Sequence, residues 1–258
     1  MSDSTTIANG ELAEENAVHA ATHAAHPPYQ RHHFESVAQQ FDATNFAMWL
    51  FLLTEVMFFG GLFTSYLIMR NWYYEAFVEG SHHLSIFWGT TNTAVLITSS
   101  FTMAMGVWCA QMRRKTALVL FLSLTFFLGL VFLCIKGIEW HQEWVDHHVP
   151  GLRFNESDFL NPALDPEVYH EYHDKPLTGG MASKTEEYFF LYFAMTGMHA
   201  LHMVIGIGIL IFMLFQAKRG AYTDGHFTFV ENFGLYWHFV DIIWIFLFPL
   251  LYLVSRHA

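Results

Sequence analysis

Five long apolar runs constrain the fold of this chain more than any other feature of its sequence. They cover residues 46–69, 87–112, 116–140, 188–217 and 233–255. A helix of about 20 apolar residues crosses the hydrocarbon core of a bilayer, and only helices or closed barrels satisfy the backbone there. The runs do not alternate between apolar and polar residues as barrel strands do. The sequence therefore predicts an all-α, polytopic membrane bundle with five transmembrane helices.

The two longest polar segments flank or interrupt these runs. Residues 1–42 are predicted to form a polar, mobile N-terminal tail, and residues 43–258 the five-helix membrane domain. The loop 141–187 carries ten acidic residues against three basic ones, which is typical of a solvated surface and also compatible with a docking face for a basic partner. The tail holds five histidines that could bind a metal ion, although a mobile tail is the simpler interpretation: His19, His23, His26, His32 and His33.

Basic residues in the short loops predict the orientation of the helices. Arg113-Arg114-Lys115 and Lys218-Arg219 fall on the same side of a five-span chain, and such residues are concentrated in cytoplasmic loops. The N-terminus is then cytoplasmic, and the C-terminus and the acidic loop lie outside. The formal net charge of −11, with no larger basic patch, argues against binding to nucleic acid.

Five ionisable residues lie within the apolar runs and are the candidate functional residues. They are Glu55 in the first run, His199 and His202 in the fourth, and His238 and Asp241 in the fifth. Such groups cost a few kcal/mol or more at bilayer depth, so they need partners. We expect one buried, hydrogen-bonded cluster, in which a protonated Glu55 donates a hydrogen bond to the fourth run.

A further pair of charges, Lys136 and Glu139, lies near the outer end of the third run. The two residues are separated by three positions, so they share one helix face and are expected to form an ion pair near the membrane surface.

Several functions remain open for the histidines and carboxylates. His199 and His202 project from one side of a helix and cannot both be axial ligands of one haem iron, whereas His202 and His238 on facing helices could be. His199, His202 and Asp241 could instead hold a metal ion, or the groups could relay protons. We favour contacts that join helices, with no catalytic residue and no metal or cofactor site.

Ordered motifs give the chain a resemblance to a known family. The stretch GLYWHFVDIIWIFLF (residues 234–248) resembles the last-helix signature of subunit III of haem-copper terminal oxidases, the cytochrome c oxidase type. Three further segments resemble other helices of that family in the same order, and KGIEW resembles its Glu-Tyr pair: WLFLLTEVMFFGG (49–61), NTAVLITSSFT (92–102), KGIEW (136–140) and FAMTGMHALHMVIG (193–206). Five spans in place of seven resemble the short bacterial form.

The resemblance implies a role for the chain and for its buried polar residues. Glu55 matches the carbodiimide-reactive glutamate of the family, and His199, His202, His238 and Asp241 match its polar helix contacts. The family member carries no redox centre. Haem and copper belong to partner subunits of a complex that reduces oxygen to water and pumps protons.

The same resemblance implies partners and a location. The chain would pack against subunit I, support its proton uptake and stabilise it, in a complex with subunit II and smaller subunits in the bacterial inner membrane. Phospholipid is a candidate ligand, and a respiratory supercomplex a candidate assembly. Two alternatives are an accessory five-helix subunit of a nitric oxide reductase and, from another class, a haem-binding membrane anchor.

Overall fold

The described part of the chain is helical. The computed structural model describes residues 37–151, 154–155, 159, 180, 183–222 and 227–254. These residues form six helices: α2 (Val37–Trp72), α3 (Tyr74–His83), α4 (Ile86–Gln111), α5 (Lys115–Val145), α9 (Thr185–Arg219) and α10 (Thr228–Tyr252). All except α3 are long and apolar enough to cross a membrane. The predicted all-α fold with five spanning helices is confirmed.

The spanning helices are longer than most of the apolar runs that predict them. Helix α2 begins at Val37, so six residues assigned to the polar tail are helical. Helix α5 continues to Val145 and α9 begins at Thr185, which makes both ends of the segment 141–187 helical. The N-terminal residues 1–36, with the five tail histidines, lie outside the described residues, as does most of the acidic loop.

The short helix α3 joins the first two spans and was not predicted. One face of α3 is buried, including Ala76, Phe77 and Gly80. The ring of Phe77 packs edge-on against Tyr66 of α2 and Tyr188 of α9, with centroid separations of 5.2 and 5.4 Å. Helix α3 therefore closes one end of the bundle through contacts made by its own apolar face.

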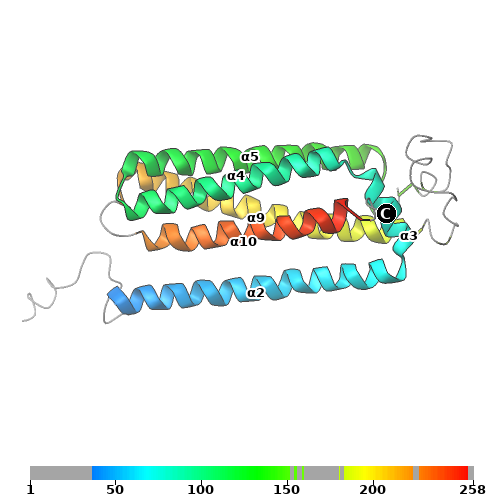
Figure 1. Cartoon of the computed structure of the whole chain (residues 1–258), viewed down its shortest axis with the longest axis horizontal. Helices are drawn as coiled ribbons and strands as arrows, with labels where there is room; N and C mark the ends of the chain where they lie inside the picture. The colour runs from blue at the N-terminus through cyan, green and yellow to red at the C-terminus, as the bar shows by residue number, and fades with distance from the viewer. Residues whose placement is uncertain are drawn as a thin grey trace, which may run out of the picture. The chain divides into compact units, whose positions relative to one another are not determined.

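The chain divides into two compact units, residues 1–50 and 51–258. Within the second unit, α4, α5, α9 and α10 run side by side (Figure 1). A three-residue turn, in which Arg113 has a left-handed φ of 55°, reverses the chain between α4 and α5. Gln111 at the end of α4 donates a hydrogen bond of 2.7 Å to Glu231 in the first turn of α10. The C-terminal end of α4 therefore lies beside the N-terminal end of α10, and successive helices of this bundle run antiparallel.

Trp237 of α10 fills the centre of the bundle. A Cβ atom added at Gly206 of α9 would lie 2.9 Å from its ring, and one added at Gly129 of α5 would lie 3.1 Å from it. The indole Nε1 donates to Ser99 Oγ of α4 at 3.1 Å. The two glycines leave the space that this fully buried ring occupies, and the ring in turn brings four helices together.

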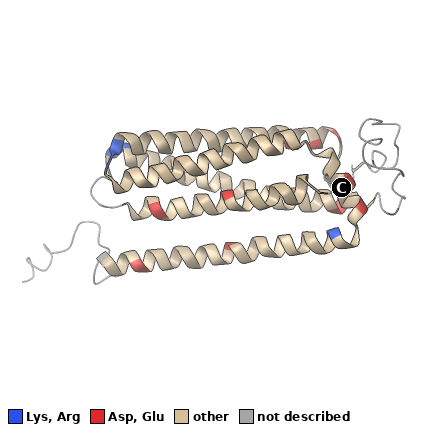
Figure 2. Cartoon of the chain, in the orientation of Figure 1, with Lys and Arg blue, Asp and Glu red and all other residues tan. Residues whose placement is uncertain are grey.

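The outer face of the spanning helices is apolar. Large apolar side chains are exposed on each of the five long helices. Charged residues are few along the middle of the helices, and Lys and Arg residues mark the α4–α5 turn (Figure 2). This distribution is that of helices whose outer surfaces contact lipid or other membrane proteins.

Candidate functional site

Glu55 and His202 join α2 to α9. Glu55 Oε2 lies 3.0 Å from His202 Nε2, and His202 Nδ1 lies 2.8 Å from the carbonyl oxygen of Met198. A carbonyl only accepts, so Nδ1 carries a hydrogen atom and donates it. The contact between Nε2 and Oε2 then contains one proton, bound to one atom or the other, and the pair has no net charge. The ring of Phe59 packs 5.3 Å from the imidazole, and Tyr236 donates to the His202 carbonyl.

His199 joins α9 to α10 rather than to α2. Its Nε2 donates to the carbonyl oxygen of Val240 at 3.1 Å, and its buried ring lies between Phe132 and Trp244, with centroid separations of 5.4 and 5.1 Å. Its Nδ1 has no hydrogen-bond partner among the described residues. Although His199 and His202 are three positions apart, they contact different neighbouring helices.

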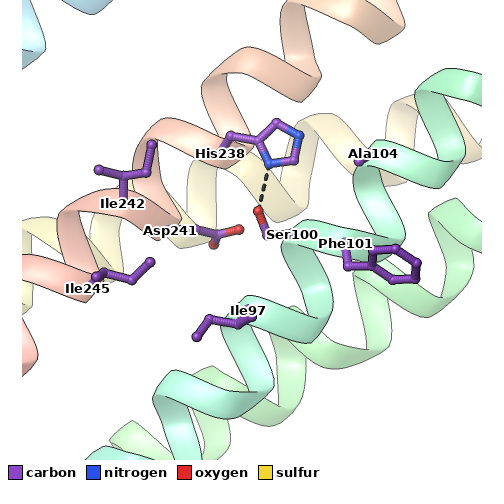
Figure 3. A pocket seen from close by; sticks show the side chains of 8 residues that line it. All are labelled: Ile97, Ser100, Phe101, Ala104, His238, Asp241, Ile242 and Ile245. Carbon is purple, nitrogen blue, oxygen red and sulfur yellow. Dashed lines mark hydrogen bonds between the residues drawn. The ribbon is translucent and has the colours of Figure 1, made fainter.

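His238 and Asp241 of α10 face α4. His238 Nδ1 lies 2.6 Å from Ser100 Oγ, and the carboxyl group of Asp241 points toward the same serine (Figure 3). Asp241 is 2% exposed, and its carboxyl group interacts with the Ser100 hydroxyl, although neither oxygen makes a well-formed hydrogen bond within the described residues. The three side chains line a cavity of about 370 Å3 between the two helices, together with Ile97, Phe101, Ala104, Ile242 and Ile245.

Lys136 and Glu139 form the centre of a buried polar network. Lys136 Nζ lies 3.1 Å from Glu139 Oε1, 2.9 Å from the hydroxyl of Tyr192 and 2.7 Å from that of Tyr252. Both tyrosines donate to Glu139 Oε1, Tyr192 at 2.6 Å. The ammonium also lies 4.6 Å from the ring centre of Tyr192 and 5.2 Å from that of Trp244. Lys136 and Glu139 are each 2% exposed, so this pair belongs to the core where α5, α9 and α10 meet.

The structure distributes the candidate residues over separate contacts. Glu55 with His202, His199, and His238 with Asp241 each join a different pair of helices. Sequence reasoning missed the hydroxyl groups that complete two of the contacts, those of Ser100, Tyr192 and Tyr252. The signals for these were weak, because serine and tyrosine are common in membrane helices and their partners lie more than 50 residues away in the sequence.

Two of the histidines that could hold a metal ion or haem, His202 and His238, are already engaged in hydrogen bonds. Both nitrogens of His202 make contacts within the chain, and His238 uses Nδ1 to contact Ser100. In the described part of the chain, no group of three or more histidine, cysteine, aspartate or glutamate residues is arranged to hold a metal ion. The geometry is suited to joining helices inside the membrane.

Comparison with known proteins places the chain in a family. The model of the family described as cytochrome c oxidase subunit III matches residues 168–256. A cytochrome c oxidase subunit 3 of Thermostichus vulcanus is 31% identical over 208 residues, which are 80% of this chain and 85% of the relative. Proteins of the same name from Corynebacterium diphtheriae and a Synechocystis species are each 28% identical, over 80% and 83% of this chain and 85% and 76% of the relative. With five apolar spans and buried polar contacts between them, this chain belongs to the subunit III family of haem-copper oxidases.

Proposed function

We propose that this chain is the non-redox subunit III of an aerobic respiratory oxidase in a bacterial inner membrane. The complex reduces oxygen to water and pumps protons, while its haem and copper are bound by partner subunits. Family membership supports the oxidase complex. The engagement of His199 and His202 in contacts between helices supports a subunit that carries no catalytic centre of its own.

Within the complex, the chain stabilises subunit I and supports its proton uptake, with subunit II and smaller subunits as further partners. The observation that carries this role is the contact between Glu55 and His202 at 3.0 Å. It ties α2 to the rest of the unit through a pair without net charge, at a depth where lone charges are costly. Breaking it loosens α2 and changes the surface that the chain presents to its partners. Phospholipid is a candidate ligand of that apolar surface, and a supercomplex a candidate assembly.

The proposed orientation places the N-terminus in the cytoplasm and the C-terminus outside. Arg113, Arg114 and Lys115 occupy the α4–α5 turn, and Lys218 and Arg219 the end of α9. Because successive helices are antiparallel, both basic sites lie at one end of the bundle, which the positive-inside rule assigns to the cytoplasm.

The membership of an oxidase complex is tested by isolating the tagged chain from native membranes in mild detergent. Co-purifying chains are identified by mass spectrometry, and a reduced-minus-oxidised spectrum is recorded. We expect a- or o-type haem together with a large multi-helix partner. Haems of b and c type without an oxidase partner would indicate a nitric oxide reductase accessory subunit. Haem that stays on this chain after its partners are removed would indicate a haem-binding anchor.

The supporting role is tested by measuring proton uptake during turnover. Glu55→Leu removes the contact with His202, and Glu187→Leu, at a carboxylate with a 43% exposed side chain, is the matched control. We expect the Glu55 variant to assemble with an unchanged haem spectrum and slower proton uptake. Uptake equal to that of the control would show that the contact has no such role.

A further inference from the structure

Asp241 is a buried carboxyl group whose hydrogen-bonding capacity is largely unused within the described part of the chain. It is 2% exposed, and neither oxygen makes a well-formed hydrogen bond there. Ser100 faces it across the cavity and interacts with it, but Ser100 also contacts His238 at 2.6 Å, and its single hydroxyl proton serves at most one of the two carboxyl oxygens (Figure 3). Glu55, the comparable carboxyl of α2, has its partner in His202 of the same bundle. Since a buried acceptor without a donor is costly, Asp241 requires a donor from elsewhere.

We infer that the cavity between α4 and α10 is the docking site for a transmembrane helix of a neighbouring subunit, which places a hydrogen-bond-donating side chain against Asp241. The inference rests on the proposed function, because it assumes that the chain is one subunit of a membrane complex. It adds to that function by naming the surface used and the chemistry of the partner.

The depth of Asp241 favours a protein donor over a lipid. Asp241 lies 13 residues after Thr228 and 11 before Tyr252, the two ends of α10. At about 1.5 Å per residue, the carboxyl is roughly 16–20 Å from either end of the helix. Lipid headgroups lie near those ends, and the acyl chains beside Asp241 carry no donors. A polar side chain of another membrane-spanning helix supplies a donor at this depth.

The form of the cavity also suits a helix. Two of the four α4 side chains that line it, Ser100 and Ala104, are small, so another backbone can approach closely there. The rim is apolar and open to the outside, since Phe101 is 63% exposed and Ile97 is 54% exposed. A partner helix would cover this rim with apolar side chains while one polar side chain reaches into the volume of about 370 Å3.

Photo-cross-linking in native membranes tests the inference. A benzophenone amino acid replaces Phe101 at the rim, in the otherwise unchanged chain and together with Asp241→Leu, Asp241→Asn or the matched control Ile242→Leu. We expect an adduct with a different membrane-spanning polypeptide. Asp241→Leu should lower its yield about tenfold, as the loss of one buried hydrogen bond of about 1.4 kcal/mol does. The control and Asp241→Asn, which keeps an acceptor oxygen, should retain most of it.

A second variant keeps the test decisive if Asp241→Leu does not accumulate. Ala104→Phe fills the cavity from the α4 side without altering the carboxyl, and it should also remove the adduct. Adducts with lipid alone, adducts with a second copy of this chain, or a yield that neither variant changes would each overturn the inference.

Haem in the same preparation separates this inference from the proposed function. Oxidase haem without a partner adduct would overturn the docking site and leave the proposed function standing. A partner adduct without oxidase haem would support the docking site and overturn the proposed function.

Discussion

Removing the ammonium of Lys136 is expected to destabilise the chain strongly. Glu139 Oε1 accepts hydrogen bonds from Lys136, Tyr192 and Tyr252, and the carboxylate is 2% exposed. The variant Lys136→Met has a side chain of similar length but leaves this carboxylate buried without its cation. Breaking one side of a buried ion pair costs about 3–5 kcal/mol, and the cation–π contact with the Tyr192 ring is lost as well.

Two control variants accompany this prediction. One also removes the charge of Glu139, and the other removes a lysine from an exposed ion pair. The double variant Lys136→Met/Glu139→Gln removes both charges and keeps an acceptor for the two tyrosine hydroxyls. It should recover more than half of the lost stability, because replacing a whole buried pair is often close to neutral. Lys184 and Glu187 form an exposed pair at 3.7 Å, and Lys184→Met should cost less than about 1 kcal/mol.

The assay heats the purified complex and follows the folded fraction of the tagged chain by size-exclusion chromatography. A loss of 3–5 kcal/mol corresponds to a fall of roughly 6–20 °C in the midpoint for a chain of this size. If Lys136→Met lowered the midpoint no more than Lys184→Met, or if the double variant were less stable than the single one, the assignment of a buried, compensated charge pair would be refuted.

Three further perturbations test other contacts of the bundle. Gly206→Leu drives a side chain into the ring of Trp237 and should cost about 1–3 kcal/mol or more in the same heating assay, whereas Gly208→Leu, with open space around it, should be nearly neutral. Tyr66→Phe removes a hydrogen bond of 2.6 Å to a carbonyl of α10 and should cost about 1 kcal/mol, and an unchanged midpoint would contradict that contact. In infrared difference spectra, Glu55→Gln should lose a protonated-carboxyl band, and loss of a carboxylate band would instead establish an imidazolium–carboxylate pair.

The five spans were predictable because hydropathy and length are local properties of the sequence. The ends of the helices were less predictable, because a helix continues beyond its apolar run where the charges near its ends interact favourably with the helix dipole. Helix α9 begins with Glu186 and Glu187 in its first turn and ends with Lys218 and Arg219 in its last. This arrangement favours the helix dipole and extends the helix past both predicted limits. Helix α3 was missed because its burial depends on Tyr188, which is far away in the sequence.

The candidate residues could be identified one by one, but their pairing could not. An ionisable side chain inside an apolar run is recognisable at once, as Glu55 and Asp241 were. The helical spacing of His199 and His202 puts them about 60° apart around one axis. That separation is small enough to suggest one cluster, yet large enough for His202 to reach α2 while His199 reaches α10. Whether the two histidines form one cluster or two separate contacts depends on where the neighbouring helices lie. The periodicity within one helix carries no information about those positions.

Charge compensation distinguishes two kinds of buried carboxyl group in the described part of this chain. Lys136 with Glu139, and Glu55 with His202, each reach zero net charge through side chains of the same chain. Asp241 has no such compensation among the described residues. The first two contacts therefore contribute to the stability of the bundle itself, so their disruption should lower the unfolding midpoint. The capacity of Asp241 is used only when a donor arrives from outside, so its disruption should weaken association with a partner and leave the midpoint of the chain nearly unchanged once its partners have been removed. Equal effects of the two kinds of variant on the midpoint would show that Asp241, too, is compensated within the chain.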